Sequence, residues 1–489
     1  MNNATYPTPP MKTRNTTIAR PLPFRLALAA LAASAVLAGC SMIPTYERPA
    51  APIDAQWPGA TATTASASTP AAELAWQDYF SDPALRRLIG IALVNNRDLR
   101  VAVLNIEQAR AQLGIKRADQ FPTVNAGITG SRTPNSSGGT TSAYSAGLLV
   151  TAYEIDFFGR VASLKEQALA QYLATTEGSK TAQISLISTV AQTWLSLLAD
   201  EELLALSKQT LATREDSLKL VQLRLENGAA SELDRHQAQS LAAAARVTLA
   251  QQQRQRALDE NALVLLLGQA VPAEVRAQFA SAQLTQLRLP ELPAGLPSDL
   301  LTRRPDIRQA EQLLIANNAN IGAARAAFFP RISLTAGFGS GSDALAGLFK
   351  DGSWGFTMAP QLLLPLFDAG RNQAGLDSAK TGRDIAVAQY EKAIQSAFRE
   401  VADALAGRDT LAEQLRAQQT QTDAETQRLR LTDLRLQNGA ASQLDSLDAQ
   451  RSLFGAQQAL VQTRLAYLQN QVVLYKTLGG GATGTVSRP

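Results

Sequence analysis

The stretch QLDSLDAQ places two carboxylates, Asp445 and Asp448, three residues apart. On a helix this spacing puts both side chains on one face, where they would attract cations and repel anions. A simpler interpretation is that acids near the start of a helix favour the positive end of its dipole. The related stretch ELDRHQAQ, 211 residues earlier, has Asp234 in the first position but Gln237 in the second. Asp448 therefore has no acidic counterpart, which argues for a special role.

Other residues that commonly perform chemistry are scarce in this sequence. The chain has one histidine, His236, and one cysteine, Cys40. A single histidine excludes a multi-histidine metal site, and a single cysteine excludes an intramolecular disulfide. The sequence also contains no P-loop, dinucleotide fingerprint or nucleophile elbow. These observations disfavour an enzyme and predict no cofactor and no metal site.

The N-terminus resembles a lipoprotein signal peptide. Residues 1–39 carry four basic residues and no acid, followed by the apolar segment FRLALAALAASAVLAGC. That segment is short for a membrane-spanning helix. It ends at Cys40 in the order of the bacterial lipoprotein box, which predicts removal of 1–39 and acylation of Cys40. The alternative is an ordinary signal peptide with Cys40 as a chance residue.

Composition points to helices and away from nucleic acid. Hydrophobic residues make up 45% of the chain, aromatic residues 6% and charged residues 18%, as expected for long helices packed through small side chains. Without the four basic residues of the leader, 46 − 4 = 42 basic residues balance 42 acidic ones. A neutral mature chain has no electrostatic reason to bind nucleic acid.

The chain repeats itself. RLENGAASELD begins at residue 224 and RLQNGAASQLD at residue 435, an offset of 435 − 224 = 211; upstream, Asp98-Leu99-Arg100 matches Asp306-Ile307-Arg308 at an offset of 208. We interpret the chain as two repeats whose length difference falls in a segment that tolerates it. The expected organisation is an extended segment over 40–80, a first repeat over 81–268, a proline-rich connector over 269–298, a second repeat over 299–479 and a flexible tail over 480–489.

Each repeat is expected to contain one β-hairpin, over about 122–156 and about 330–366. Apolar residues stand there at every second position, from Tyr144 to Ala152 for example, in runs of about ten residues, the length of a membrane-spanning strand. Four strands cannot close a barrel, which needs about eight, and open edges cannot face lipid. Hairpins in a membrane therefore require several copies, and three copies would supply twelve strands. The alternative is a small soluble sheet packed on helices.

Long helical hairpins are expected to complete each repeat. No proline occurs from 159 to 227, and leucines recur every seven residues, which is typical of a supercoiled seam: Leu197, Leu204, Leu211, Leu218 and Leu225. The second repeat has Thr422 in its stripe. We expect the returning helix, 231–267, to cover half of its long partner. One helix over about 82–118 would cover the other half, end to end with it.

The repeated sequence marks the tips of these hairpins. Glycine accepts the left-handed conformation that ends a helix, and Ser231 or Ser442 can cap the next helix with Asp234 or Asp445 in its first turn. The two expected tips, both built from small residues that permit close approach of a partner, are Asn227, Gly228, Ala229, Ala230 and Ser231 in the first repeat and Asn438, Gly439, Ala440, Ala441 and Ser442 in the second.

The lipoprotein box, the paired hairpins and the stretches CSMIPTYERP, YEIDFFGR and PLFDAGR together resemble the TolC family of outer-membrane efflux proteins, in its OprM-like lipoprotein branch. The resemblance implies a homotrimer: a mainly α chain with a transmembrane β part, in which a twelve-stranded β-barrel in the outer membrane is continuous with a twelve-helix periplasmic α-barrel. It implies a lipid-anchored exit duct of a tripartite pump for drugs and other toxic small molecules, not an enzyme. The implied partners are outer-membrane lipid, a periplasmic adaptor and an inner-membrane resistance-nodulation-division pump.

The same resemblance implies roles for the sites above. Aspartates matching Asp445 and Asp448 line the periplasmic aperture in the family, and the tips would meet the adaptor. Some relatives carry an arginine link partner where this chain has Ala441, so the tie would use Arg435, Arg451 or neither. The alternatives left open are a duct for type I protein secretion, a duct for metal efflux, and a structural coiled-coil lipoprotein.

Overall fold

The computed structural model describes residues 41–54, 56–57, 70–136, 138–279, 283–293, 295 and 297–481. The leader, Cys40 and residues 482–489 lie outside the described residues. The chain divides into two compact units, a sheet unit built mainly from 120–163 and 322–369 and a helical unit containing 164–321 and 370–481. This division cuts across the two repeats of the sequence, because strands of both repeats pair with one another and helices of both repeats pack together.

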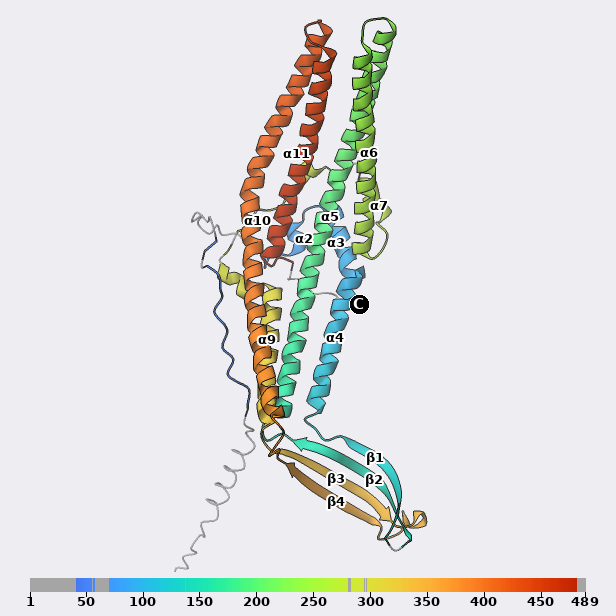
Figure 1. Ribbon diagram of the computed structural model, residues 1–489, viewed down its shortest axis with the longest axis vertical. Coiled ribbons are helices and arrows are strands. Elements are labelled where there is room, and N and C mark those ends of the chain that lie inside the picture. Colours follow the sequence, from blue (N-terminus) through green and yellow to red (C-terminus); the bar gives the residue numbers. More distant parts are fainter. Residues whose placement is uncertain are drawn as a thin grey trace, which may run out of the picture. The chain divides into compact units, whose positions relative to one another are not determined.

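The sheet unit contains one antiparallel sheet in the order β1-β2-β3-β4 (Figure 1). Its strands are β1 (Val124–Pro134), β2 (Thr140–Ile155), β3 (Arg331–Ser342) and β4 (Trp354–Leu363). A short 3₁₀ turn, η3 (Leu345–Gly347), lies in the loop between β3 and β4. The two hairpins expected from the alternating pattern are confirmed, and pairing of β2 with β3 joins them.

The register places the alternating apolar residues on one face of the sheet. Ala126 pairs with Leu148, Leu148 with Phe338, and Phe338 with Phe356. These four residues form one row across all four strands, since paired residues point to the same side. Phe356 and most other large side chains of this face are exposed in the single chain.

One expected detail of β2 is wrong. The pattern from Tyr144 to Ala152 predicts unbroken alternation, but the register between β2 and β3 shifts between Val150 and Tyr153. Ala152 takes a left-handed backbone, with φ of 51°, as the extra residue of a β-bulge does. After the bulge, Tyr153 pairs with Leu334 and is back on the apolar face.

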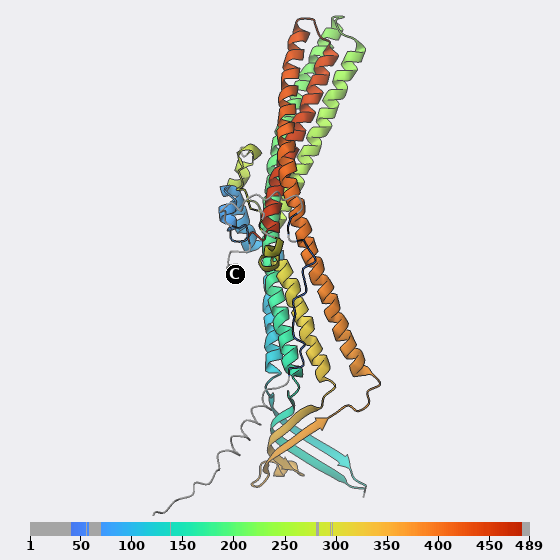
Figure 2. The same ribbon diagram turned by 90° about the vertical axis from the view of Figure 1, so that its left-hand side faces the viewer.

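The helical unit contains two long hairpins, α5 with α6 and α10 with α11. Both hairpins run side by side and turn at the same end of the unit (Figures 1 and 2). Their bounds are α5 (Arg160–Glu226), α6 (Glu232–Leu267), α10 (Arg371–Gln437) and α11 (Gln443–Thr477). The expected helices over 159–227 and 231–267 are confirmed to within a residue at each end.

The expectation of a single helix over 82–118 is wrong, because two helices occupy this range. They are α3 (Pro83–Asn95) and α4 (Arg97–Ala118), with counterparts α8 (Leu300–Arg303) and α9 (Pro305–Ala326) in the second half. The break is at Asn96, whose extended backbone ends α3 and whose side chain caps α4 by accepting a hydrogen bond from the Leu99 amide at 2.8 Å. Asparagine favours such caps over helix interiors.

Each short returning helix meets its end-to-end partner at a joint, and the two joints are alike. The Asn96 amide donates to the Leu266 carbonyl at 2.9 Å, and the Arg304 guanidinium donates to the Thr477 carbonyl at 3.0 Å. The offsets are 304 − 96 = 208 and 477 − 266 = 211, as the repeat predicts. The expected end-to-end arrangement of α6 with the helix before the first strand is therefore confirmed.

Short elements and aromatic side chains fill the middle of the helical unit. They are α2 (Trp76–Tyr79), α7 (Ala273–Gln278), η1 (Leu284–Gln286) and η2 (Pro297–Asp299). The rings of Tyr79 and Tyr475 stack at 4.1 Å between centroids in the hydrophobic core. Contrary to the expected flexible tail, Gly480 and Gly481 are buried, and Gln183 donates to the Gly481 carbonyl at 3.1 Å.

The leucine stripe of α5 is buried at Leu197 and Leu204 and half-buried from Leu211 toward the tip. Among the described residues, α5 is the one helix long and apolar enough to cross a membrane, but 67% of its apolar window is buried inside the protein. We therefore describe α5 as a core helix. Thr422 of α10 is buried, and its hydroxyl is satisfied by donating to the carbonyls of Gln418 and Ala456.

Candidate functional site at the hairpin tips

The two tips have nearly identical backbones. Gly228 and Gly439 take left-handed conformations, with φ of 73° and 72°. The next amide closes each turn, from Ala229 to the Arg224 carbonyl and from Ala440 to the Arg435 carbonyl, both at 2.8 Å. The expected glycine-terminated turns are confirmed, and both leave their small side chains at the surface.

Each returning helix begins with a capping box, the expected arrangement. The Ser231 hydroxyl accepts from the Asp234 amide at 3.1 Å, and the Asp234 carboxylate accepts from the Ser231 amide at 2.9 Å. Ser442 and Asp445 repeat this arrangement at 3.2 and 2.8 Å. Hydrogen bonds from the serine hydroxyl and amide hold the pKa of both aspartates below the ordinary value. Asp445 is therefore ionised and occupied with its own helix.

Asp448 has different surroundings from Asp445. It accepts from the Arg428 guanidinium of α10 at 2.7 Å and also pairs with Arg451 of its own helix. Arg428 in turn pairs with Glu425 at 3.2 Å. The hydrogen bond from Arg428, together with the positive charges of both arginines, lowers the pKa of Asp448. Of the two link partners considered from the sequence, Arg451 contacts the acid within one chain, whereas Arg435 donates to the Ala440 carbonyl.

Arg428 is the site residue that sequence reasoning missed. Its counterpart in the first repeat is Ser217 (428 − 211), and the counterpart of Asp448 is Gln237 (448 − 211). Both members of the ion pair are thus uncharged in the first repeat. A search for pairs of positions that change charge together between repeats would have found it.

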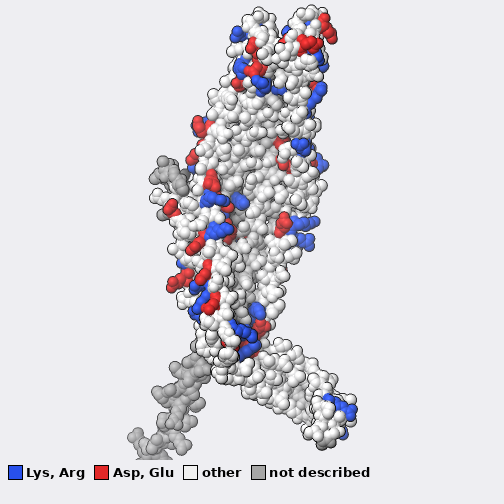
Figure 3. All heavy atoms as spheres, viewed as in Figure 1, with Lys and Arg blue, Asp and Glu red and all other residues white. Residues whose placement is uncertain are grey.

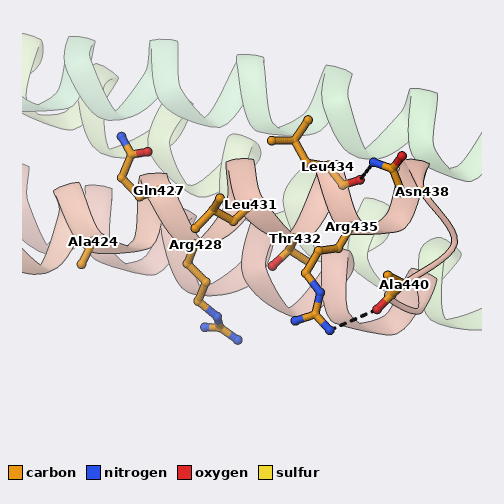
Figure 4. Close-up of a pocket in the computed structure, with 9 residues that line it drawn as sticks. All are labelled: Ala424, Gln427, Arg428, Leu431, Thr432, Leu434, Arg435, Asn438 and Ala440. Atoms are coloured by element: carbon orange, nitrogen blue, oxygen red, sulfur yellow. Dashed lines mark hydrogen bonds between the residues drawn. The ribbon is translucent and has the colours of Figure 1, made fainter.

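A groove of about 760 Å³ follows α10 to the tip. It is lined by Ala424, Gln427, Arg428, Leu431, Thr432, Leu434, Arg435, Asn438 and Ala440. Figure 4 shows Arg428 and Arg435 extending from the same side of α10, with Leu431 between them along the helix. Leu431 is 54% exposed, so the groove combines exposed apolar surface with two cations.

Charged side chains lie at the tips and at several levels along the helices, and they are sparse over the strands (Figure 3). The strands carry Arg132 near one end of the sheet and Glu154 with Arg331 at the other, and the last two form an ion pair at 2.7 Å. Within the residues that the structure describes, no group of three or more histidine, cysteine or acidic residues could hold a metal.

Comparisons with known proteins agree on one family. The family model described as outer membrane efflux protein matches residues 88–269 and 296–480. The toluene efflux pump outer membrane protein TtgC of Pseudomonas putida is 50% identical over 455 residues, with 91% of this chain and 93% of TtgC covered. The antibiotic efflux pump outer membrane protein ArpC of the same species has the same identity and coverage.

Among solved structures, the open state of the MtrE outer membrane channel of Neisseria gonorrhoeae superimposes with a TM-score of 0.83. It is 41% identical, and the match covers 91% of this chain and 99% of that one.

Proposed function

Because the chain belongs to the outer membrane efflux protein family, and is thus an outer-membrane channel component of an efflux pump, we propose that three copies of it form the complete exit duct of a tripartite pump. Each copy would contribute four strands to a twelve-stranded barrel and four long helical columns to a twelve-helix periplasmic barrel. The chain would be a duct and not an enzyme, with no cofactor.

The open sheet is the observation that carries this proposal. Its outer strands, β1 and β4, have no further strand partner among the described residues. One face is apolar and exposed, and charges are confined to strand ends. Lipid requires both a closed hydrogen-bond ladder and an apolar outer face. Joining β1 of one copy to β4 of the next meets the first requirement, and the apolar row meets the second.

An internal duplication accounts for the number of helices. We infer it from equal element lengths: α5 and α10 have 67 residues each, and α4 and α9 have 22 each. The equivalent joints at Asn96 and Arg304 support the same inference. A trimer of duplicated chains would have approximate sixfold symmetry in its helical part.

The trimer can be tested by extracting the protein from membranes and measuring its mass by light scattering, before and after heating. We expect the unheated protein to have about three times the mass of one mature chain, which is below 52.1 kDa after removal of residues 1–39, and we expect single chains after heating. A monomer or dimer in the unheated extract would contradict the proposal.

We propose hydrophobic toxic compounds as the cargo, because the relatives are named for toluene and antibiotic efflux. Deletion of the gene should lower tolerance to solvents and antibiotics, and the intact gene should restore it. Unchanged tolerance to all compounds, with loss of protein secretion or metal tolerance, would assign the duct to one of those cargoes instead.

We propose that both tips contact a periplasmic adaptor, which joins the duct to an inner-membrane resistance-nodulation-division pump. The support is the surface position and small side chains of both turns, from Asn227 to Ser231 and from Asn438 to Ser442. Ala230→Trp and Ala441→Trp should abolish resistance at normal trimer level, because a bulky side chain prevents close approach. Ala230→Ser and Ala441→Ser are the matched controls. Full resistance in both tryptophan variants would contradict the contact.

We also propose that Asp445 and Asp448 of three copies form six carboxylates around the periplasmic aperture, and that Cys40 carries a lipid anchor in the outer membrane. The aperture proposal rests on the ionised state of both acids. The anchor proposal rests on the sequence around Cys40 alone.

A further inference from the structure

A buried cation lies where the two hairpins meet. Arg214 of α5 is only 5% exposed. Its Nη1 atom donates to the Leu241 carbonyl of α6 at 3.1 Å, and its guanidinium lies 5.4 Å from the ring centroid of Phe454 of α11. Three helices therefore surround this side chain.

Two nitrogens of Arg214 are left over. Nε and Nη2 are buried and have no hydrogen-bond acceptor in the part of the chain that the structure describes. These two N–H groups lie on one edge of the guanidinium and point in parallel, as the fork that binds a carboxylate or another anion. The Leu241 carbonyl occupies the third nitrogen, so it fixes the plane of the fork. The Nε–H and Nη2–H groups thus lack an acceptor but are held in a fixed orientation.

Nearby charges do not compensate Arg214. The neighbouring Glu215 pairs with Arg246 at 2.7 Å. Arg451 of α11 adds positive charge, and burial together with this charge lowers the pKa of Arg214. A buried cation without a counter-charge is destabilising, so the surroundings favour uptake of a negative charge.

Two amides on the same helices are also incompletely bonded. Gln237 precedes Leu241 by one turn of α6, and Gln450 precedes Phe454 by one turn of α11. Each has a buried Oε1 without a donor among the described residues. Rotating an amide by 180° exchanges its oxygen and nitrogen. Each amide can therefore present an N–H group at the position of its unpartnered oxygen.

The second repeat does not share this feature. The counterpart of Arg214 is Glu425 (214 + 211), which pairs with Arg428 at 3.2 Å. The buried cation is therefore not a packing element of both hairpins. It is a property of the seam of α5, α6 and α11.

We propose that the Nε/Nη2 fork of Arg214 binds one small monovalent anion, of the size of chloride, between α5, α6 and α11. The anion would accept both N–H groups and neutralise the buried charge, so it would stabilise the packing of the first hairpin against α11. The site has Arg451 as a neighbour in common with the aperture acid Asp448, and it does not depend on the cargo.

The test uses full-length protein in detergent, with unfolding followed by tryptophan fluorescence. Thermal midpoints are compared in sodium chloride and in sodium gluconate at equal ionic strength, because gluconate is too large for a buried site. Chloride at about ten times its dissociation constant should raise the thermal midpoint by about 1–3 °C. Arg214→Gln should abolish the difference, and Lys219→Gln, at an exposed position of the same helix, should keep it.

A shift of equal size in Arg214→Gln, or no shift in the wild type, would overturn the proposal. Water bound to Nε and Nη2 of Arg214 would then be the remaining explanation. Should Arg214→Gln fail to fold, bromide-soaked crystals of the wild type decide the matter. An anomalous peak within hydrogen-bond distance of Nε and Nη2 supports the site, and its absence there overturns it.

Discussion

The Arg428 guanidinium of α10 donates to the Asp448 carboxylate of α11 at 2.7 Å and ties the two helices of the second hairpin together near its tip. The corresponding positions of the first hairpin are Ser217 and Gln237, which cannot form an ion pair. The two hairpins of one chain therefore have the same turn but different electrostatics. Only the second hairpin has the Arg428–Asp448 ion pair, and this pair includes one of the proposed aperture acids.

The Arg428–Asp448 ion pair predicts opposite effects of two substitutions on ion selectivity. Trimers of Asp445→Ala/Asp448→Ala in planar bilayers should lose cation preference and block by divalent ions from the periplasmic side, because the carboxylates are gone. Arg428→Gln should increase cation preference, because Asp448 loses a counter-charge. Asp234→Ala, which removes the equivalent helix cap from the first hairpin, is the control. Unchanged selectivity in the double variant would place the aperture at other residues.

The buried carboxyl group of Asp200, beside that of Asp259, predicts a pH dependence of stability. Burial, followed by the hydrogen bond and negative charge of Asp259, raises the pKa of Asp200 to about 8. Glu201 also raises it, and Arg256 opposes the shift. The native state thus holds a proton that the unfolded state releases near pH 4. The contribution of this proton to stability is fully present below about pH 4 and is lost as pH rises to about 8.

The slope for this proton is at most about 1.4 kcal/mol per pH unit. Asp200→Asn should flatten the dependence, measured as the denaturant midpoint across this range. Asp216→Asn, at an exposed position of the same helix, should leave it unchanged. An equally steep fall in Asp200→Asn would show that other groups cause it.

The capping boxes predict local rather than global losses. Ser231→Ala or Ser442→Ala removes one hydroxyl that accepts a helix amide, at a cost of about 1 kcal/mol. Because the tips are exposed turns, amide hydrogen exchange should rise within the first turn of α6 or α11 only. Thr at the same position should restore protection. Faster exchange throughout α5 or α10 would show that the cap controls the whole hairpin.

The joints predict a ranking of glycine substitutions. A Cβ on Gly268, at φ of 66°, would lie well inside van der Waals contact with the Asn95 carbonyl. A Cβ on Gly479, at φ of 84°, would lie 3.4 Å from the Arg303 carbonyl. Gly268→Ala should therefore lower the thermal midpoint more than Gly479→Ala. Gly90→Ala, with open space in the helix α3, should be neutral or stabilising. Equal losses at both joints would contradict the ranking.

The proposed barrel predicts that the lipid anchor is secondary. Cys40→Ala protein, exported with a different signal peptide, should still form membrane trimers, because twelve strands hold it in the bilayer. Membrane fractionation and mass measurement check this. Complete recovery in the soluble periplasm would contradict it.

The sequence predicted the features that depend on neighbouring residues. Absence of proline and a sevenfold leucine pattern predicted α5 to within a residue, and Asn227-Gly228 predicted its turn. The capping boxes at Ser231 and Ser442 followed from the same local chemistry. Alternation predicted the hairpins, because strand faces have period two.

Features that depend on distant residues were missed. The break at Asn96 is stabilised by the Leu266 carbonyl, 170 residues away, and a uniform helical pattern runs through it. Gly480 and Gly481 read as a mobile tail, yet Gln183 of α5 holds the Gly481 carbonyl. The pairing of Arg428 with Asp448 and of Asp200 with Asp259 likewise appears only when helices are placed side by side.

The two open edges of the sheet make the time before assembly important for each molecule. A newly exported chain carries unpaired backbone groups along β1 and β4, and all ten residues of β4 are exposed. Such edges pair with any extended polypeptide they meet. A lone copy in the aqueous periplasm is therefore a hazard in proportion to its waiting time. Under the proposed association of three copies, the time that a single copy spends unassembled sets how long its edges stay open to such pairing.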